Sequence, residues 1–320
     1  MTKTSLLVMS LIMGITSQVQ AENLCLDQLS SEKVNQLFSE FGSTGKMPPQ
    51  LGRWLNDPDV QTVKPFQLFD NVQFVGVCWV SSWLLKSDQG LILIDSLYQP
   101  YTDTLLKNVE KLGYKLSDIK YVLITHGHFD HAGGVGILKK SLPNARIGMT
   151  AEGWNEAYHD ANSPRHKNDW EMPKKPDLIL TDNQVITLGN TKVTVYTTPG
   201  HTWGTTSFVF DVFDHGKKYK AVTIGGLGLN AISGPEQVET YIQSVDKLKS
   251  LVLSKEDPIT IDLTAHPFSA NLMENIELMK KRSSKDGNLL VNQKELISKL
   301  DELKGAAEKR LVIEKQKEGK

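Results

Sequence analysis

Apolar and polar positions follow two rhythms along this chain. Short runs of β-branched and aromatic residues predict strands, whereas leucines and valines spaced three and four positions apart predict helices. The predicted strands cover residues 72–80, 81–87, 90–96, 121–125 and 145–150, several segments between 178 and 213, and residues 219–226 and 259–263, the last of which runs into a loop. The predicted helices cover residues 102–112, 135–141, 235–252 and 293–320. Strands and helices that alternate, then cluster and alternate again indicate an α/β fold with two sheets and helices outside them.

Two segments depart from this alternation. Residues 152–176 are rich in Trp, Asn, His, Pro and Lys and are predicted to form a long irregular connection. The charged tail carries a single apolar stripe, formed by Leu296, Leu300, Leu303 and Ala307. This stripe predicts a terminal helix that lies along the body of the protein and frays at its end.

The first 21 residues have the pattern of a secretory signal peptide. Lys3 is followed by an apolar run from Leu6 to Ile15, and the segment ends on the small residue Ala21. The apolar run is too short to cross about 30 Å of hydrocarbon as a helix. We therefore expect cleavage after Ala21 and a mature chain that is periplasmic or secreted, soluble, and without stable membrane insertion.

Composition narrows the class of protein further. Hydrophobic residues make up 39% and charged residues 23% of the 320 positions, which is typical of a globular protein with a sizeable core. The formal net charge is -1 and no long basic run is present, so a nucleic-acid partner is not expected. The two cysteines, Cys25 and Cys78, would be unrelated buried thiols in a reducing compartment. Export favours a single disulfide, which would join the N-terminal segment to the strand carrying Cys78.

Metal-ligand side chains are concentrated in the stretch THGHFDHAGG. It holds three of the eight histidines and an aspartate directly after the predicted strand 121–125. Zinc binds imidazole and carboxylate groups, and alternate side chains of a strand point to one face. His126 and His128 can therefore face one point, and Asp130 and His131 a second, although a plain solvated loop is the alternative interpretation.

Two further histidines supply ligands that this stretch lacks for two metals. His201 lies in a glycine-flanked loop, TTPGHTWGTTS, between two predicted strands, and His266 lies in the stretch TAHPFS that follows the predicted strand 259–263. The resulting hypothesis has a first group and a second group of three ligands each: His126, His128 and His201 in the first, and Asp130, His131 and His266 in the second. The remaining histidines are expected to be exposed surface residues: His159, His166 and His215.

This arrangement resembles the metallo-β-lactamase superfamily. The resemblance rests on the motif H-x-H-x-D-H after a strand, on Asp95 at the end of the strand GLILID, on TPGHT and on His266, and it covers roughly residues 72–283. It implies a four-layer αβ/βα sandwich with a centre of two zinc ions per chain at one edge. The chain is accordingly expected to divide into a signal peptide, an N-terminal arm, a hydrolase domain and a charged C-terminal helix, with bounds of 1–21, 22–70, 71–285 and 286–320.

Details of the motifs indicate one branch of that superfamily. Glyoxalase II-like thioesterases carry a bridging aspartate after the strand that here reads AVTIGGLGLN, and the first lactamase subclass has a cysteine zinc ligand there. Neither residue type stands in this stretch. GHTWGTTS, HPFS and the cysteine in VGVCWV are similar to the third lactamase subclass, some members of which pair that cysteine with one near the mature N-terminus.

One departure from that subclass concerns the substrate. Its members usually carry serines that hold the β-lactam carboxylate, where this chain has Gly226 and Gly228. The anchor is therefore either missing or supplied by another residue such as Asn230 or Thr202, and Trp203 stands where many relatives have proline. Trp203 and Asn230 are therefore the expected substrate contacts, and Gly226→Ser is expected to lower KM for β-lactams.

The resemblance implies a hydrolase with a small-molecule substrate. A hydroxide activated by zinc would attack an amide carbonyl, and Asp130 would orient it while binding the second zinc. A β-lactamase is the first hypothesis, and a lactonase or a small ester or thioester hydrolase of the same fold is the second. A structural zinc clip in a periplasmic binding protein is disfavoured, because structural zinc sites are normally closed by four protein ligands.

Overall fold

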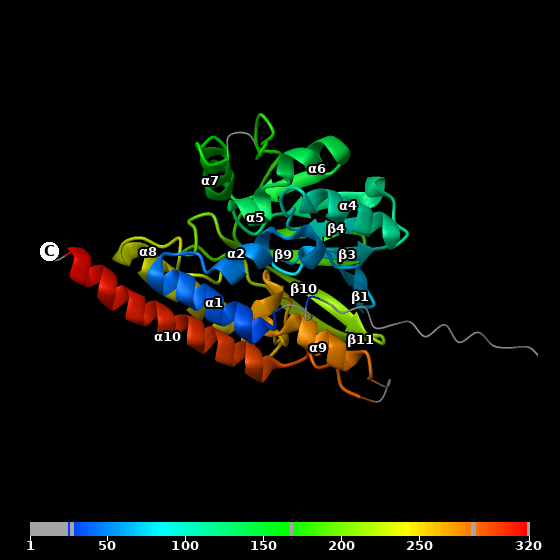
Figure 1. Cartoon of the computed structure of the whole chain (residues 1–320). Helices are drawn as coiled ribbons and strands as arrows, with labels where there is room; N and C mark the ends of the chain where they lie inside the picture. Colours follow the sequence, from blue (N-terminus) through cyan, green and yellow to red (C-terminus); the bar gives the residue numbers. More distant parts are fainter. Residues whose placement is uncertain (1–24, 26–28, 167–168, 283–285, 319–320) are drawn as a thin grey trace, which may run out of the picture.

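Two β-sheets lie face to face, and helices cover the outer face of each (Figure 1). The computed structural model describes residues 25, 29–166, 169–282 and 286–318. The expected signal peptide, residues 1–21, lies outside the described residues. The layers follow the order helix, sheet, sheet, helix, so the expected four-layer sandwich is confirmed.

Seven strands form the first sheet and five form the second. The first sheet has the order β1 (Phe66–Phe69), β2 (Val72–Phe74), β3 (Trp83–Ser87), β4 (Gly90–Ile94), β5 (Ile119–Leu123), β6 (Arg146–Met149), β7 (Leu178–Ile179). The second has the order β12 (Ile261–Asp262), β11 (Lys217–Thr223), β10 (Thr206–Asp214), β9 (Thr191–Thr197), β8 (Val185–Leu188). Strands β4 to β7 are parallel. Their carboxyl ends therefore meet at one edge, where α/β sheets commonly bind ligands.

Alternate side chains of both sheets fill the space between them. In β3, Trp83 and Leu85 belong to this central core, whereas Leu84 points to the helix-covered side. In β9, Val193 and Val195 belong to the same central core, and the residues on either side of Val193 are more exposed. This period of two is the pattern from which the strands were predicted.

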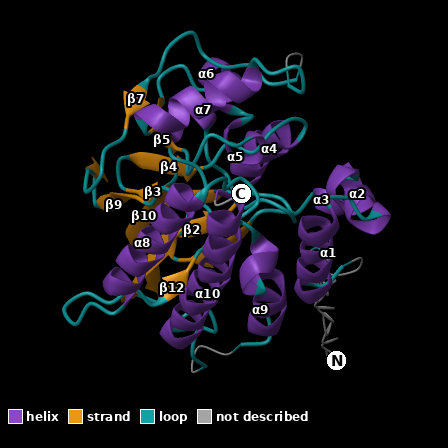
Figure 2. Ribbon diagram, turned by 90° about the vertical axis from the view of Figure 1, so that its left-hand side faces the viewer, coloured by secondary structure: helices purple, strands orange, loops and turns teal. Residues whose placement is uncertain are grey.

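Helices of the outer layers pack their apolar faces on the sheets. The first sheet is covered by α4 (Tyr101–Lys111), η1 (Leu116–Asp118), α5 (Phe129–Ala132), α6 (Val135–Ser141) and α7 (Ala151–Ala161). The second sheet is covered by α8 (Pro235–Val252) and α10 (Gln293–Glu318), which lie side by side (Figure 2). Leu296, Leu300 and Ala307 of α10 are buried there, which confirms the expected helix along the body. Within the described ranges, no helix is both long and apolar enough to cross a membrane.

The N-terminal part forms three helices before β1 joins the first sheet, namely α1 (Ser31–Thr44), α2 (Pro49–Asn56) and α3 (Pro58–Gln61). The Ser30 hydroxyl caps α1 by accepting a hydrogen bond from Lys33 N, and Gly45 ends it with a φ of 66°. Helix α1 lies beside η2 (Pro267–Ala270) and is tied to α9 (Leu272–Met279) by Ser31, whose hydroxyl donates to Glu274 Oε2 at 2.8 Å.

The strand predicted over residues 72–80 is shorter than expected. It ends with β2, because the chain turns tightly at Gly76, where a Cβ atom would lie 2.6 Å from Val80 O. Cys78 consequently lies in a loop and not in a strand. The expected disulfide between Cys25 and Cys78 is present and joins the N-terminal segment to this loop.

Two other segments differ from their predictions. The first part of the segment 152–176 is helical and not irregular, because it belongs to α7, whose first turn is capped by Thr150 Oγ1 accepting from Gly153 N at 3.0 Å. The strand predicted over 259–263 shortens to the two residues of β12, and the loop predicted after it is present. The chain after β12 is therefore loop, and loop position depends on side-chain contacts more than on a sheet ladder.

Candidate metal centre

All six side chains of the first and second groups meet at the edge where the parallel strands end. Two lie in the turn after β5, two in α5, one in the loop between β9 and β10, and one in the loop after β12: His126, His128, Asp130, His131, His201 and His266. The structure therefore brings together side chains from three separate parts of the chain.

In the first group, three imidazole nitrogens face a common point. His128 Nδ1 lies 3.1 Å from His126 Nε2 and 3.1 Å from His201 Nε2. A tetrahedral zinc ion with Zn–N bonds of about 2.0–2.1 Å separates its ligand atoms by roughly 3.4 Å. The spacing of the three nitrogens is close to this requirement, so the group fits a zinc ion.

The second group combines one carboxylate with two imidazoles. Asp130 Oδ2 lies 3.2 Å from His131 Nε2 and 3.7 Å from His266 Nε2, and the two nitrogens are 3.3 Å apart. These three atoms carry lone pairs, so they repel one another unless a proton or a cation lies between them. The donor set and its spacing fit a divalent cation that accepts nitrogen and oxygen ligands, zinc in particular.

The other ring nitrogen of four of these histidines has an acceptor, which fixes the tautomer that a metal needs. A ring N–H that donates to an oxygen leaves the second nitrogen with a free lone pair facing the group. The four pairs are His201 Nδ1 with Gly228 O at 2.6 Å, His266 Nδ1 with Trp79 O at 2.9 Å, His131 Nδ1 with Asp95 Oδ2 at 2.8 Å, and His126 Nδ1 with Thr125 Oγ1 at 3.1 Å. All four rings are thus held in an orientation suited to binding a metal.

Asp95 is the centre of the supporting network beside the second group. It is 1% exposed and accepts the Thr125 backbone N–H at 2.7 Å and the Thr125 hydroxyl at 3.0 and 2.9 Å, in addition to His131. Its φ of 62° is uncommon for a residue other than glycine. The sequence pattern marked Asp95 only as the end of a strand. Its contact with His131 joins residues 36 positions apart, which no local pattern predicts.

Burial and neighbouring charges decide which of these groups hold a proton. Burial lowers the pKa of His201 to about 3 and that of His266 to about 4. Burial also lowers the pKa of His131, but the carboxylates of Asp130 and Asp95 outweigh it and raise this pKa to about 10. Burial raises the pKa of Asp130, whereas the nearby histidines, His131 above all, hold it below its ordinary range. In the metal-free second group both ring nitrogens of His131 are therefore protonated at neutral pH.

Helices α7 and α8 hold the loop that carries His201. Glu156 of α7 accepts the backbone N–H of Trp203 at 2.8 Å, and Gln237 of α8 donates to Gly200 O at 2.8 Å. Burial raises the pKa of Glu156. Sequence analysis missed Glu156, because the segment that contains it was expected to be irregular.

Gly226 is required by the packing of His201. A Cβ atom at residue 226 would lie 2.4 Å from His201 Cβ and 2.6 Å from its Cδ2, so one of the two residues would have to move. This close contact argues against the expectation that Gly226→Ser lowers KM, because a serine would displace a member of the first group. Gly228 is less constrained, since its Cβ would meet Asn230 Oδ1 at 2.4 Å, the tip of a side chain that can rotate.

A cleft of about 900 Å³ borders both groups and includes His128, Asp130 and His201 in its wall. It is also lined by Trp203 and Asn230, the two expected substrate contacts. Trp203 is 46% exposed, which leaves its ring available to a bound molecule. The roles of Trp203 and Asn230 stay predictions.

The segment 152–176 contributes further residues to this cleft: His159, Arg165 and His166. His166 is 11% exposed and stacks on Phe129, with ring centroids 4.4 Å apart, so the expectation of an exposed surface histidine is wrong there. His159 is exposed as expected but lies at the cleft, and His215 is exposed in the turn between β10 and β11. Arg165, which sequence analysis did not single out, is the one arginine or lysine among the described residues lining the cleft.

This chain is similar to a known protein family and to several solved structures. Residues 75–214 match the family described as "Metallo-beta-lactamase superfamily". The native FEZ-1 metallo-beta-lactamase from Legionella gormanii has a TM-score of 0.70 and 27% identity, and the match covers 80% of this chain and 98% of that one. BJP-1, a subclass B3 metallo-beta-lactamase of Bradyrhizobium japonicum, has a TM-score of 0.68 and 26% identity, covering 80% and 96%.

Curated sequence relatives carry a different activity in their names. A hydroxyacylglutathione hydrolase of Rhodopseudomonas palustris is 33% identical over 137 residues, which are 43% of this chain and 45% of that protein. Another, from Buchnera aphidicola, is 30% identical over 127 residues, 39% of this chain and 41% of that protein. The chain thus spans less than half the length of the curated relatives it matches.

Proposed function

We propose, from the premise that residues 75–214 form a metallo-beta-lactamase superfamily domain, that this chain is a zinc-dependent hydrolase that opens the amide bond of β-lactams. The observation that carries the proposal is the pair of three-ligand groups at one edge of the sandwich, beside a cleft of substrate size. Among the described residues each group has three protein ligands, and not the four that close a structural zinc site, so each leaves a position for water or substrate.

Two zinc ions per chain are proposed to bind to these groups. Bound zinc lowers the pKa of water toward 7 and polarises a carbonyl oxygen. Asp130 lines the cleft and stays ionised, so its carboxylate can bind in the second group and orient an attacking water by accepting its hydrogen bond. Asp95 and Gly228 O keep the rings of His131 and His201 in the ligating tautomer.

The composition of the second group supports the lactamase branch. The glyoxalase II-like branch is expected to carry an aspartate shared by both metals after the strand that here is β11. Residues 224–230 hold no carboxylate, and Gly226 packs directly against the His201 ring. A group completed by His266 is what the resemblance to the third subclass implies, and both solved structures named above are metallo-beta-lactamases.

A lactone, ester or thioester hydrolase is the second candidate. It is favoured by the identity with hydroxyacylglutathione hydrolases over 137 residues and by the lack of hydroxyl groups at residues 226 and 228. Both candidates use the same metal chemistry. They differ in whether the cleft must hold a substrate carboxylate.

Arg165 is proposed to hold that carboxylate. Its guanidinium offers a positive charge, whereas glycines at residues 226 and 228 offer no side-chain donor, and Arg165 lines the same cleft as His128, Asp130 and His201. Trp203 and Asn230 are proposed to contact the rest of the substrate, the indole by apolar packing and the amide by hydrogen bonds.

A comparison of substrates on one zinc-loaded preparation tests the proposal. We expect turnover of a chromogenic cephalosporin to exceed that of a homoserine lactone and of a glutathione thioester. His126→Ala and His266→Ala should each remove mainly one zinc and most of the activity, whereas His215→Ala, outside the cleft, should change neither. Absence of transition metal in undialysed protein would contradict the metal assignment. Rapid lactone or thioester cleavage without cephalosporin turnover would favour the second candidate.

Export to the periplasm or the medium is also proposed. The pattern of residues 1–21 and the Cys25–Cys78 disulfide support it, because disulfides persist in oxidising compartments. Fractionation of cells that express the full chain tests it, and recovery of uncleaved, reduced protein in the cytoplasm would contradict it.

A further inference from the structure

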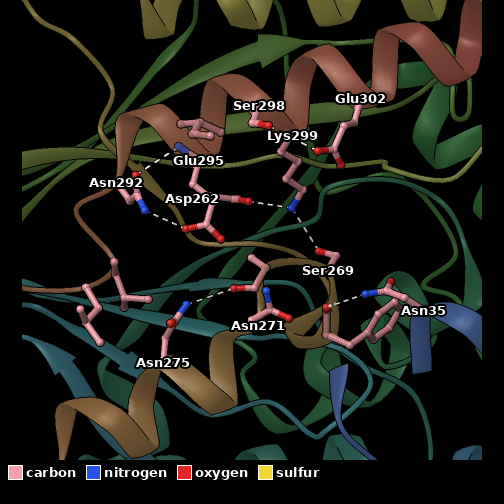
Figure 3. A pocket seen from close by; sticks show the side chains of 15 residues that line it. Asn35, Asp262, Ser269, Asn271, Asn275, Asn292, Glu295, Ser298, Lys299 and Glu302 are labelled. Atoms are coloured by element: carbon pink, nitrogen blue, oxygen red, sulfur yellow. Dashed lines mark hydrogen bonds and ion pairs between the residues drawn. The ribbon is translucent and has the colours of Figure 1, made fainter. Parts of the chain in front are cut away.

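Helix α10 lies outside the residues that match the superfamily, yet it borders the loop that carries His266. A polar cavity of about 300 Å³ separates α10 from η2 and α1 (Figure 3). Its wall contains Asp262 of β12, Ser269 of η2 and Lys299 of α10. These three side chains point toward one another in Figure 3.

Lys299 joins β12 and η2 from the side of α10. Its Nζ lies 2.7 Å from Asp262 Oδ2 and donates to Ser269 Oγ at 3.1 Å. The Lys299 and Asp262 side chains are 14% and 10% exposed, so water screens this ion pair little. Asp262 Oδ1 is buried and has no hydrogen-bond partner among the described residues, which leaves Lys299 as the group that balances its charge.

Ser269 links Lys299 to the backbone of His266 through hydrogen bonds. Its hydroxyl donates to His266 O at 2.9 Å and lies 2.5 Å from Thr264 Oγ1, which in turn accepts the backbone N–H of His266 at 3.2 Å. Both backbone polar groups of His266 are therefore held by hydroxyls in contact with one another, and Lys299 fixes one of these hydroxyls.

The loop needs such support because little regular structure precedes it. Strand β12 has two residues, and the chain from residue 263 to His266 forms no ladder. His266 is also the most exposed member of the second group at 20%, against 15% for Asp130 and 0% for His131. Its ring position therefore depends on the hydrogen bonds around the loop.

We propose that Lys299 is a positioning residue for His266, and that α10 thereby sets the zinc affinity of the second group. This inference rests on the proposed function, since it assumes that the second group binds zinc. It assigns to the charged C-terminal helix a role at the metal centre in addition to its packing on α8.

Lys304 provides a matched control on the same helix. Its Nζ lies 2.8 Å from both carboxylate oxygens of Asp246 in α8, so Lys304→Met removes an ion pair that docks α10 without touching the His266 loop. Lys299→Met leaves Asp262 without its cation in a buried site, which can weaken folding. The double variant Lys299→Met with Asp262→Asn removes this charge and still lacks the contact to Ser269.

The experiment is chelator competition on the zinc-loaded full chain, with bound zinc measured against free zinc and unfolding midpoints recorded alongside. We expect the wild type to release two zinc ions. Lys299→Met and the double variant should hold one of them about tenfold more weakly, at the low end of the effect of outer contacts on metal ligands. Lys304→Met should match the wild type in both affinities, even where its unfolding midpoint falls.

Three results would overturn the inference. Equal zinc affinities in Lys299→Met and the wild type would show that the loop needs no cation. Equal weakening in Lys299→Met and Lys304→Met would show a general effect of helix docking. A double variant with the zinc affinity of the wild type would show that the weaker binding in Lys299→Met comes from the unpaired Asp262 charge and not from the lost contact to Ser269. A wild type that binds no zinc would instead show that the proposed function itself has failed.

Discussion

Asp95→Asn keeps the shape of the side chain beside the second group and changes only its hydrogen-bonding groups. It therefore tests the protonation of His131 separately from the position of its ring. Asparagine has the shape of aspartate but offers one acceptor oxygen and one NH₂ group. Asp95 uses both oxygens as acceptors, one for Thr125 N at 2.7 Å and the other for His131 Nδ1 at 2.8 Å. Either orientation of the amide therefore places a donor against a donor.

The magnitude follows from these two contacts. Leaving one buried N–H without an acceptor costs about 1–3 kcal/mol in the free energy of unfolding of the metal-free protein. His131 can avoid this cost by losing its Nδ1 proton, so that Nδ1 accepts from the amide and Nε2 keeps its hydrogen. That hydrogen then points at His266 Nε2, 3.3 Å away, and occupies the position of a metal. We expect zinc affinity of the second group to fall about 10–100-fold.

Chelator competition measures the zinc affinities of the variant, and denaturant unfolding of the metal-free protein measures its stability. Asp103→Asn is the control, because Asp103 is exposed on α4 and accepts a hydrogen bond from Gln99. It should leave both quantities within error of the wild type. If Asp95→Asn also leaves both unchanged, the tautomer argument is refuted. A lower free energy of unfolding with unchanged zinc affinity would refute the claim that the Nε2 hydrogen of His131 competes with zinc.

Four further outcomes are expected. Replacing Cys25 and Cys78 by serine should lower the free energy of unfolding by about 4 kcal/mol, from the loop entropy of a separation of 53 residues, and two titratable thiols in unreduced protein would contradict the pairing. In metal-free protein His131 should remain protonated at pH 8 by NMR, since its pKa is raised from 6.5 to about 10. Its stabilising contribution is complete below about pH 6.5 and is lost as pH rises through about 10, which pH-dependent unfolding measures. Arg165→Gln should raise KM about tenfold for a β-lactam carboxylate and leave KM for an uncharged lactone unchanged, and equal effects on both would refute the anchor. Gly226→Ser should lose zinc from the first group by metal analysis, and full zinc content would show that His201 tolerates the added side chain.

Helices with a clear period and a start signal were predicted closely. The prediction of 235–252 coincides with α8, which begins at a proline in its first turn, and that of 135–141 coincides with α6. The strand predicted over 72–80 was too long, because Val75, Val77 and Val80 are buried around a turn at Gly76 and lie outside β2. A run of apolar residues in the sequence indicates that the segment is buried, but a buried segment can be either a strand or a packed loop.

The sequence by itself indicated the alternation of elements through local periodicity and the disulfide through the presence of only two cysteines in a chain expected to be exported. It also indicated the six side chains of the two groups, four through a short dense motif and two through histidines in loops next to predicted strands. Only the tertiary structure decided which groups orient those side chains. His131 meets Asp95 across 36 positions, His201 meets Gly228 across 27, and Lys299 meets Ser269 across 30. Such pairs depend on strand order and loop closure, which set the distance between remote residues and leave no periodic trace in the chain.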